Sequence, residues 1–298
     1  MRAELVGWLG GLDAQTVTGY IGELLPEQAE AVVRRARAAA GEAELYYVND
    51  ELTDLARQIG AGLDTYAVDA DDDLPSPCGL LMWSRPVTTL DPDIPFQPNA
   101  VAWAAAGNHI QVQIYAHLDS QPRRAAKIEI RSLRNATGVR RFPDLHMMWE
   151  TRMIADGKER PWESTEDDDP MSYELLRGLV ATWLLIRQPA DSRSRLHDIE
   201  DLTAPKASHR RIAAAGGDPT RTTRYVTLRK RLRDPDAEPA PGDANRVYHH
   251  RWFVRPHRVT VHPATGTRRV WRGPYLAVPP GCEDAPILGT DRVFIVRR

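Results

Sequence analysis

The chain of 298 residues has few cysteines and lacks a long apolar run. Its two cysteines, Cys78 and Cys282, are too few for a disulfide framework and cannot form a metal site alone. Disulfide frameworks belong to oxidising compartments, so a reducing cytoplasm is the expected location. The apolar run at 175–186 is too short and too interrupted to span a bilayer, and the first residues lack the features of a signal peptide. We therefore expect a cytoplasmic protein without a membrane partner.

The motifs of the common enzyme classes are also missing. The sequence has no Walker A loop, no GxGxxG after a strand, no GxSxG, no HExxH and no CxxC. Nucleotide, hydrolase and zinc chemistry of the usual kinds therefore has no support. The acidic run 69–73 lacks the glycine and the distal glutamate of a calcium loop, so it indicates a solvated turn. We expect neither a cofactor nor a metal ion.

Charge is distributed unevenly along the chain, although the formal net charge is only −2. Residues 1–100 carry 17 acidic and 6 basic side chains, residues 101–200 carry 15 and 14, and residues 201–298 carry 9 and 19. A basic end of this kind predicts binding to a polyanion. The alternative is that the acidic and basic parts neutralise each other across a domain interface. Only 4 of the 39 basic residues are lysines, which is typical of a GC-rich coding sequence, so the arginine count alone indicates little.

Periodicity and capping signals predict an α+β domain at 1–190, with an antiparallel sheet covered by helices. Asn49 is placed to cap a helix that follows the β-prone run 44–48. Gly107-Asn108 is a hairpin turn between two alternating segments. The other elements expected here are helices at 26–41 and 170–188 and strands at 78–84 and 127–133.

The rest of the chain predicts a linker and a second, smaller domain. Residues 191–205 lack apolar periodicity, so we expect a linker there. Residues 206–298 begin with a basic helical patch, continue into a strand at 224–231 and end in short strands separated by turns. We expect this part to be a small, basic and mainly β domain.

Alternation within the tail predicts one face that carries arginine and histidine. In a strand over 247–255, Arg251 and Arg255 lie on the same side, because successive side chains point to opposite faces. A turn at 263–266 then allows 267–272 to return beside the preceding strand. We expect the opposite face to pack a small core from Trp252, Val254, Val259, Val261, Ile295 and Trp271.

The favoured function is association with DNA or RNA through phosphate contacts on this arginine-rich β surface. Guanidinium groups bind phosphates in a bidentate manner, and exposed aromatic side chains can stack on bases. The residues expected to make these contacts are Arg210, Arg211, Arg229, Arg231, Arg251, Arg255, Arg258, Arg268 and Arg269.

Three other functions stay open. A toxin-like nuclease would use His250 and His257 as acid and base beside arginine, or the histidines would hold a metal ion. A protein-binding or assembly module would recruit its partner through the acidic N-terminal half. A small-molecule pocket would draw on aromatic and histidine side chains of the core, for which packing is the alternative. These are Tyr46, Tyr47, Trp83, Trp103, His109, Tyr115 and His117.

Several segments spread along the chain carry a resemblance to other proteins. They are LPSPCGLLMW at 74–83, ATWLLIRQP at 181–189, the basic HRR at 209–211 leading to VTLRKR, and HRWFVRPHR, RRVWRGPYL and EDAPIL in the tail. With these segments the chain resembles an uncharacterised protein family of actinobacteria and their phages and plasmids. The resemblance spans much of the chain and implies a phage, plasmid or host–phage setting. It assigns no activity and no catalytic residue.

Overall fold

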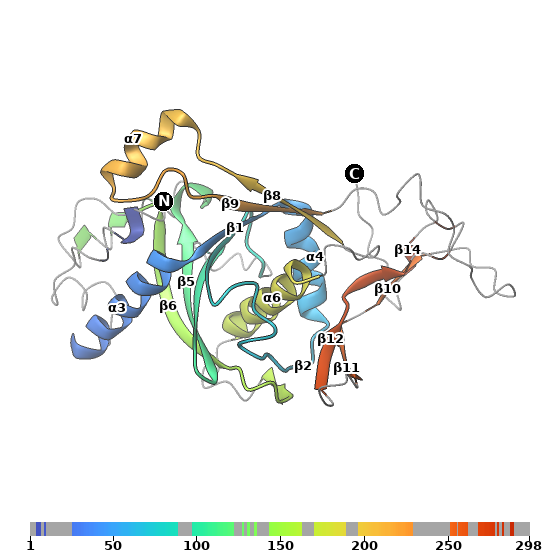
Figure 1. Cartoon of the computed structure of the whole chain (residues 1–298). Helices are drawn as coiled ribbons and strands as arrows, with labels where there is room; N and C mark the ends of the chain where they lie inside the picture. Colours follow the sequence, from blue (N-terminus) through green and yellow to red (C-terminus); the bar gives the residue numbers. More distant parts are fainter. Residues whose placement is uncertain are drawn as a thin grey trace, which may run out of the picture.

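Alternating β-prone runs and helices with apolar faces assemble into an α+β fold in the computed structural model (Figure 1). The structure describes residues 4–6, 9, 26–88, 97–121, 127, 130–131, 134–135, 143–162, 170–188, 196–228, 251–254, 256–261, 268–277, 279, 282 and 287–288. Its centre is a seven-stranded sheet in the order β6-β5-β4-β3-β1-β9-β8. The strands are β1 (Glu44–Val48), β3 (Cys78–Trp83), β4 (Ala100–Ala106), β5 (His109–His117), β6 (Leu145–Ile154), β8 (His197–Leu202) and β9 (Thr223–Leu228).

The sheet is mixed, and the predicted antiparallel sheet is therefore wrong in part. β1 runs parallel to β3 on one side and to β9 on the other, while the remaining neighbours are antiparallel. The reason lies in the connection after β1. Helix α4 (Asp50–Ala61) follows β1 directly, and a helical crossover returns the chain to the same edge of the sheet, so the next strand runs parallel.

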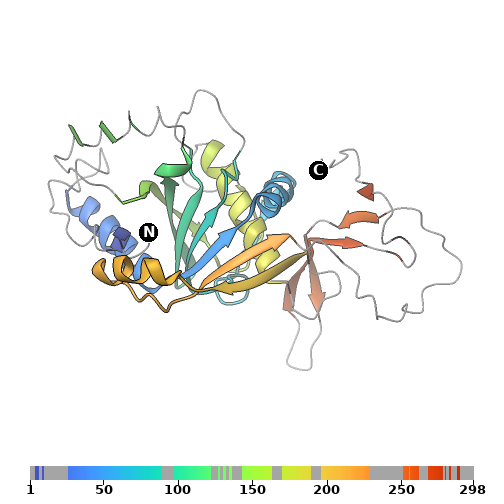
Figure 2. The same cartoon turned by 90° about the horizontal axis from the view of Figure 1, so that it is seen from above.

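Helices cover both faces of the sheet (Figure 2). Helix α3 (Pro26–Glu42) packs on one face through Val32, Val33 and Ala36, which meet the alanines of β4. Helices α4 and α6 (Pro170–Ile186) cover the other face and form the larger core with Trp83, Trp103 and Trp183. The side chains between α3 and the sheet are small, whereas those between the sheet and α4 and α6 include large aromatic rings.

Several local predictions are confirmed. Asn49 caps α4, since its side-chain oxygen accepts from the Leu52 amide at 3.1 Å. β4 and β5 form the expected hairpin, and Gly107 takes φ 62° in its turn, a conformation that glycine adopts without strain. The strand expected at 127–133 is wrong, because the residues described there, at 127, 130 and 131, are helical. Short β-prone runs do not distinguish strand from helix without their tertiary partners.

Two segments assigned to the linker and to the second domain belong to the central sheet instead. β8 lies within the predicted linker 191–205, and β9 lies within the predicted domain 206–298. β9 pairs with β1 in the register Leu45–Thr223 to Val48–Val226, and β8 closes the sheet beside it. Helix α7 (Lys206–Ala214) connects the two. The polar composition of β8 hid this strand, because an edge strand is only partly buried and needs few apolar residues.

Beyond β9, the described elements are short strands that lie past the end of the sheet (Figure 2). β10 (Arg251–Val254) pairs with β13 (Tyr275–Ala277) and β14 (Ile287–Leu288), while β11 (His257–Val261) pairs with β12 (Arg268–Arg272). Gln188 after α6 ties this region to the core, because its amide nitrogen donates to the Pro274 carbonyl and its oxygen accepts from the Leu196 amide at 2.8 Å. A fourth pairing joins β2 (Thr65–Tyr66) to β7 (Arg160–Pro161).

Candidate functional site

Helix α7 carries two of the arginines predicted to bind phosphate. Arg210 and Arg211 are both exposed. The helix begins after Pro205, and Lys206 in its first turn is exposed as well. Arg211 Nε lies 3.9 Å from Glu4 Oε1, so this arginine already has an acidic neighbour from the start of the chain.

The β11–β12 hairpin carries three more of the predicted arginines and divides them between its faces. Arg258 lies opposite Trp271 and Thr260 lies opposite Arg269, so Arg258 and Arg269 share one face. His257 opposite Arg272 and Val261 opposite Arg268 occupy the other face, together with Val259 and Val270. The expectation of one polar and one apolar face is therefore wrong for this hairpin. Arg268 and Arg269 are consecutive residues of β12, and consecutive strand positions belong to opposite faces, so arginine positions occur on both faces.

The remaining predicted residues are only partly placed. Arg251 is the first residue of β10, opposite Ile287 of β14. Arg229, Arg231, Arg255 and His250 lie outside the described residues. The proposed acid–base pair of His250 and His257 stays a prediction, with His257 exposed at the start of β11.

Within the part of the chain that the structure describes, α7 and the hairpin do not form one continuous basic surface. α7 precedes β9 and the C-terminal strands follow it, so they lie at opposite ends of that strand (Figures 1 and 2). The six residues of β9 span about 17 Å at ~3.3 Å per residue. Arg210 and Arg211 are therefore separate from Arg258, Arg268 and Arg269.

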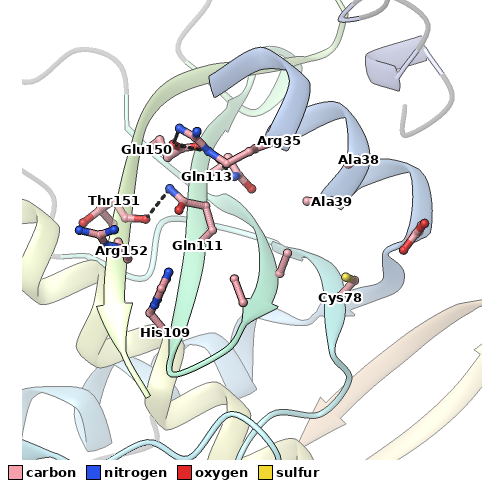
Figure 3. A pocket seen from close by; sticks show the side chains of 13 residues that line it. Arg35, Ala38, Ala39, Cys78, His109, Gln111, Gln113, Glu150, Thr151 and Arg152 are labelled. Atoms are coloured by element: carbon pink, nitrogen blue, oxygen red, sulfur yellow. Dashed lines mark hydrogen bonds and ion pairs between the residues drawn. The ribbon is translucent and has the colours of Figure 1, made fainter. Parts of the chain in front are cut away.

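A cavity of about 720 Å³ lies between α3 and the sheet (Figure 3). It falls within the range of about 300–1,000 Å³ that is usual for small-molecule sites. One side is formed by polar side chains of β5 and β6, and the other by small side chains of α3 and β4. The lining residues are Arg35, Ala38, Ala39, Glu42, Cys78, Ala104, Ala106, His109, Gln111, Gln113, Glu150, Thr151 and Arg152.

A buried carboxylate and amide form the polar end of this cavity. The Glu150 side chain is 9% exposed and pairs with Arg35, whose Nε donates to Oε1 at 3.2 Å. The other carboxylate oxygen accepts from Gln113 Nε2 at 3.0 Å. Gln113 is 0% exposed, and its Oε1 has no hydrogen-bond partner among the residues that the structure describes. Gln113 Oε1 is therefore a buried acceptor with almost no accessible surface, next to this end of the cavity.

A thiol and a second carboxylate lie at the opposite end. Cys78 is half-buried in β3, and Glu42 is exposed at the end of α3. Burial raises the pKa of the Cys78 thiol, and the Glu42 carboxylate raises it further. The thiol is thus protonated at neutral pH, which does not suit a nucleophile.

Most of the aromatic residues that the sequence offered for a small-molecule pocket pack in the core instead. Tyr46, Trp83, Trp103 and Tyr115 are buried. Tyr46 stacks on Trp103 with ring centroids 5.7 Å apart, and burial raises the pKa of Tyr46 to about 12. Tyr47 stacks on Tyr225 at 5.6 Å. Of the seven residues only His109 lines the cavity.

The acidic run 69–73 forms a turn whose carboxylates bond its own backbone. Asp69 Oδ1 accepts from the Asp71 amide at 3.0 Å, and Asp73 Oδ2 accepts from the Asp69 amide at 2.8 Å. Across the described part of the chain, no three His, Cys, Asp or Glu side chains are grouped so that they could hold a metal ion. No helix in that part is both long and apolar enough to cross a membrane.

Two patterns in the sequence correspond to the lining of the cavity, although neither alone predicts a cavity. Polar residues occupy alternate positions along β5, at His109, Gln111 and Gln113, and alanine occupies positions 100, 102, 104 and 106 along β4.

Comparison with protein-family models, curated proteins and solved structures found no match for the chain.

Proposed function

We propose that this protein associates with DNA or RNA in a phage, plasmid or host–phage setting, and that its C-terminal strands contact the phosphates. The proposal rests on charge and on the geometry of one β-hairpin. It requires no catalysis by the chain itself.

The observation that carries the proposal is the charge of residues 244–282. This stretch contains seven arginines and four histidines and has no aspartate or glutamate. The seven arginines therefore cannot be neutralised by an aspartate or glutamate of the same stretch. Polyanion phosphates offer the complementary charge, and guanidinium groups match their geometry.

The hairpin of β11 and β12 gives this charge a suitable shape. It is a two-stranded ribbon with Arg258 and Arg269 on one face and Arg268 and Arg272 on the other. A two-stranded ribbon fits the major groove of B-DNA, which is about 12 Å wide. Arginines on both faces would then reach the phosphates on both sides of the groove. His257 opposite Arg272, both exposed, adds a further donor at the start of β11.

Fluorescence anisotropy with a labelled DNA duplex and a labelled single-stranded RNA tests the proposal. We expect binding at low salt that weakens steeply as NaCl rises, because each phosphate contact releases a counterion. The double variant R258A/R269A should reduce the salt slope by roughly one per arginine that contacts a phosphate. Absence of binding to either nucleic acid at low salt would refute the proposal.

A matched control removes two exposed arginines from helix α3. Arg34 and Arg37 are exposed on α3, and alanine is the best helix former, so R34A/R37A changes the net charge equally without a loss of packing. We expect this variant to keep the salt slope of the parent. An equal loss in both double variants would mean that net charge and not the hairpin governs binding.

The nuclease alternative is tested in the same samples. Labelled RNA and DNA are incubated with the parent and with H250A/H257A, with and without EDTA. Binding without cleavage supports association alone. Cleavage that is lost in the double variant would instead assign His250 and His257 a catalytic role.

A further inference from the structure

We propose that the edge of the central sheet at β8 binds an extended, arginine-containing segment of a partner protein. The segment pairs with β8 as an additional strand and lays an arginine side chain over the ring of Tyr225. This inference does not depend on nucleic-acid binding, because the residues that carry it belong to β1, β8 and β9 and not to the basic hairpin.

β8 is the last strand on one side of the seven-stranded sheet (Figures 1 and 2). In the part of the chain that the structure describes, β9 is its only strand partner. The outward N–H and C=O groups of an edge strand are a template for a further strand. In such complexes the backbone supplies affinity, and the neighbouring side chains decide which segment fits.

Two tyrosine rings and a carboxylate lie in one row across this end of the sheet. Tyr47 of β1 is paired with Tyr225 of β9, and Tyr225 is paired with Glu200 of β8, so all three share one face. The rings stack with their centroids 5.6 Å apart. Both tyrosines are half-buried and Glu200 is exposed. Helix α3 packs on the same face over β3 and β4, which leaves the row beside it accessible.

The opposite face of the same strands shows what such groups hold. There the guanidinium of Arg224 lies over the Tyr46 ring, 5.5 Å from its centroid, and Arg224 Nη1 lies 2.6 Å from Glu44 Oε2. A tyrosine ring and a carboxylate thus bind one arginine together. Tyr225 and Glu200 offer the same two groups on the other face, and no arginine or lysine of the described residues lies over Tyr225.

The charges around the tyrosine pair also favour a cation. Burial raises the pKa of Tyr47, and Tyr225 and the Asp50 carboxylate raise it further. Glu200 adds a second exposed carboxylate at the other end of the row. A guanidinium suits this place better than an ammonium, because its plane stacks on an aromatic ring while its N–H groups bind a carboxylate.

The acidic side chains of β8 exclude β8 of a second copy as the added strand. Antiparallel pairing of two β8 strands about their centre would set Asp198 opposite Asp201, or Glu200 opposite itself. Like charges directly opposite each other destabilise a strand pair. A basic segment has the complementary charge.

The distance to Tyr225 requires a long side chain. Only β8 would separate the added strand from β9, and two strand spacings of ~4.8 Å make about 10 Å. An arginine placed opposite Glu200 therefore passes its carboxylate and ends near the ring of Tyr225.

Fluorescence anisotropy at low salt tests the proposal with labelled, end-blocked hexapeptides. One peptide alternates arginine with threonine, and its matched partner alternates lysine with threonine and has the same charge. We expect the arginine peptide to bind and the lysine peptide to bind about threefold more weakly.

Two N-methylated forms of the arginine peptide test for strand addition. Successive residues of a strand direct their N–H groups to opposite edges, so methylation of every second backbone nitrogen blocks one edge only. One form carries the methyl groups on its arginines and the other on its threonines. We expect one form to bind like the parent peptide and the other to lose binding.

Variants of the protein localise the peptide. Tyr225→Ala should weaken binding about two- to fivefold, and Tyr225→Phe, which keeps the ring, should retain it. Glu200→Lys should weaken binding about tenfold. Asp64→Lys is the matched control, because it makes the same charge change at an exposed position that follows α4, a helix on the opposite face of the sheet.

Four results would overturn the proposal. The first is no binding of the arginine peptide at low salt. The second is equal binding of the two N-methylated forms, which would exclude strand addition. The third is an equal loss in E200K and D64K, which would make net charge the cause. The fourth is a labelled single-stranded RNA that loses affinity in Y225A while the peptide does not, which would assign the tyrosine pair to base stacking.

Discussion

Replacement of Gly79 by alanine tests the packing of the larger core. Gly79 lies in β3, and the Trp103 indole of β4 crosses directly over it. An ideal Cβ at position 79 would lie 2.0, 2.3 and 2.5 Å from three atoms of that indole ring, where ordinary contacts lie at 3.4–4 Å. The indole must therefore move by more than 1 Å to admit one methyl group.

The indole has little freedom to move. Trp103 is fully buried, and its Nε1 donates to the Ser76 carbonyl at 2.9 Å. Tyr46 stacks on one side at 5.7 Å, and Trp183 meets the ring edge at 5.4 Å. Overpacking costs about 1–3 kcal/mol, and a stranded carbonyl adds about 1–3 kcal/mol. We expect G79A to lower the free energy of unfolding by about 3–5 kcal/mol.

Urea unfolding followed by tryptophan fluorescence measures this change. Gly41→Ala is the control, because an added Cβ there meets nothing within 4 Å and alanine favours the helix, so G41A should gain about 0.5–1 kcal/mol. Trp103→Phe in the G79A background should restore part of the loss, which a double-mutant cycle detects as coupling. If G79A unfolds at the same urea concentration as the parent, the packing argument for β3 and β4 is wrong.

Two further predictions concern titrating groups. Burial raises the pKa of Tyr46 from an ordinary 10.0 to about 12. The neutral phenol therefore makes its full contribution to the free energy of unfolding below pH 10. This contribution, about 3 kcal/mol, is lost as the pH rises toward 12. Tyr46→Phe should flatten the stability curve over that interval, and an unchanged slope would contradict this. Glu42→Gln removes a carboxylate that raises the pKa of Cys78, so alkylation of Cys78 at neutral pH should become faster, and an unchanged rate would show that burial alone sets its reactivity.

Local signals in the sequence predicted most elements of the core. The Asn49 cap and the Gly107-Asn108 turn depend on residues within a few positions of each other, and both are confirmed. Helix α6 was predicted from the apolar face at 170–188 and is confirmed over Pro170–Ile186. A helix or a tight hairpin forms its backbone hydrogen bonds within its own segment. The residues that specify it therefore lie close together in the sequence.

Pairing between distant segments could not be predicted in the same way. β9 pairs with β1 across roughly 180 residues, and nothing in either strand's sequence names its partner. The polar strand β8 is stabilised by this neighbour and not by an apolar pattern of its own. The cavity under α3 likewise depends on Cys78, Ala104, Gln111 and Arg152 meeting in one row, which requires the register of three strand pairs.

The structure divides the basic surplus of the last third of the chain into two parts. At 206–228 three of the four arginines contact groups in the first third of the chain. Arg224 Nη1 lies 2.6 Å from Glu44 Oε2, and Arg211 lies near Glu4. Arg221 donates to the carbonyls of Gly41 and Glu42 at 3.2 and 2.8 Å, where the negative end of the α3 dipole favours a cation.

These contacts join the acidic first third of the chain to the basic last third, so the alternative of internal neutralisation has support for this segment. The stretch 244–282 differs, because it contains no aspartate or glutamate and begins after the end of β9, the last strand of the central sheet along the chain. Surplus charge that already contacts carboxylates or carbonyls cannot also neutralise phosphates without breaking those contacts. The case for a polyanion partner therefore rests on the hairpin region and not on the charge of the whole C-terminal third.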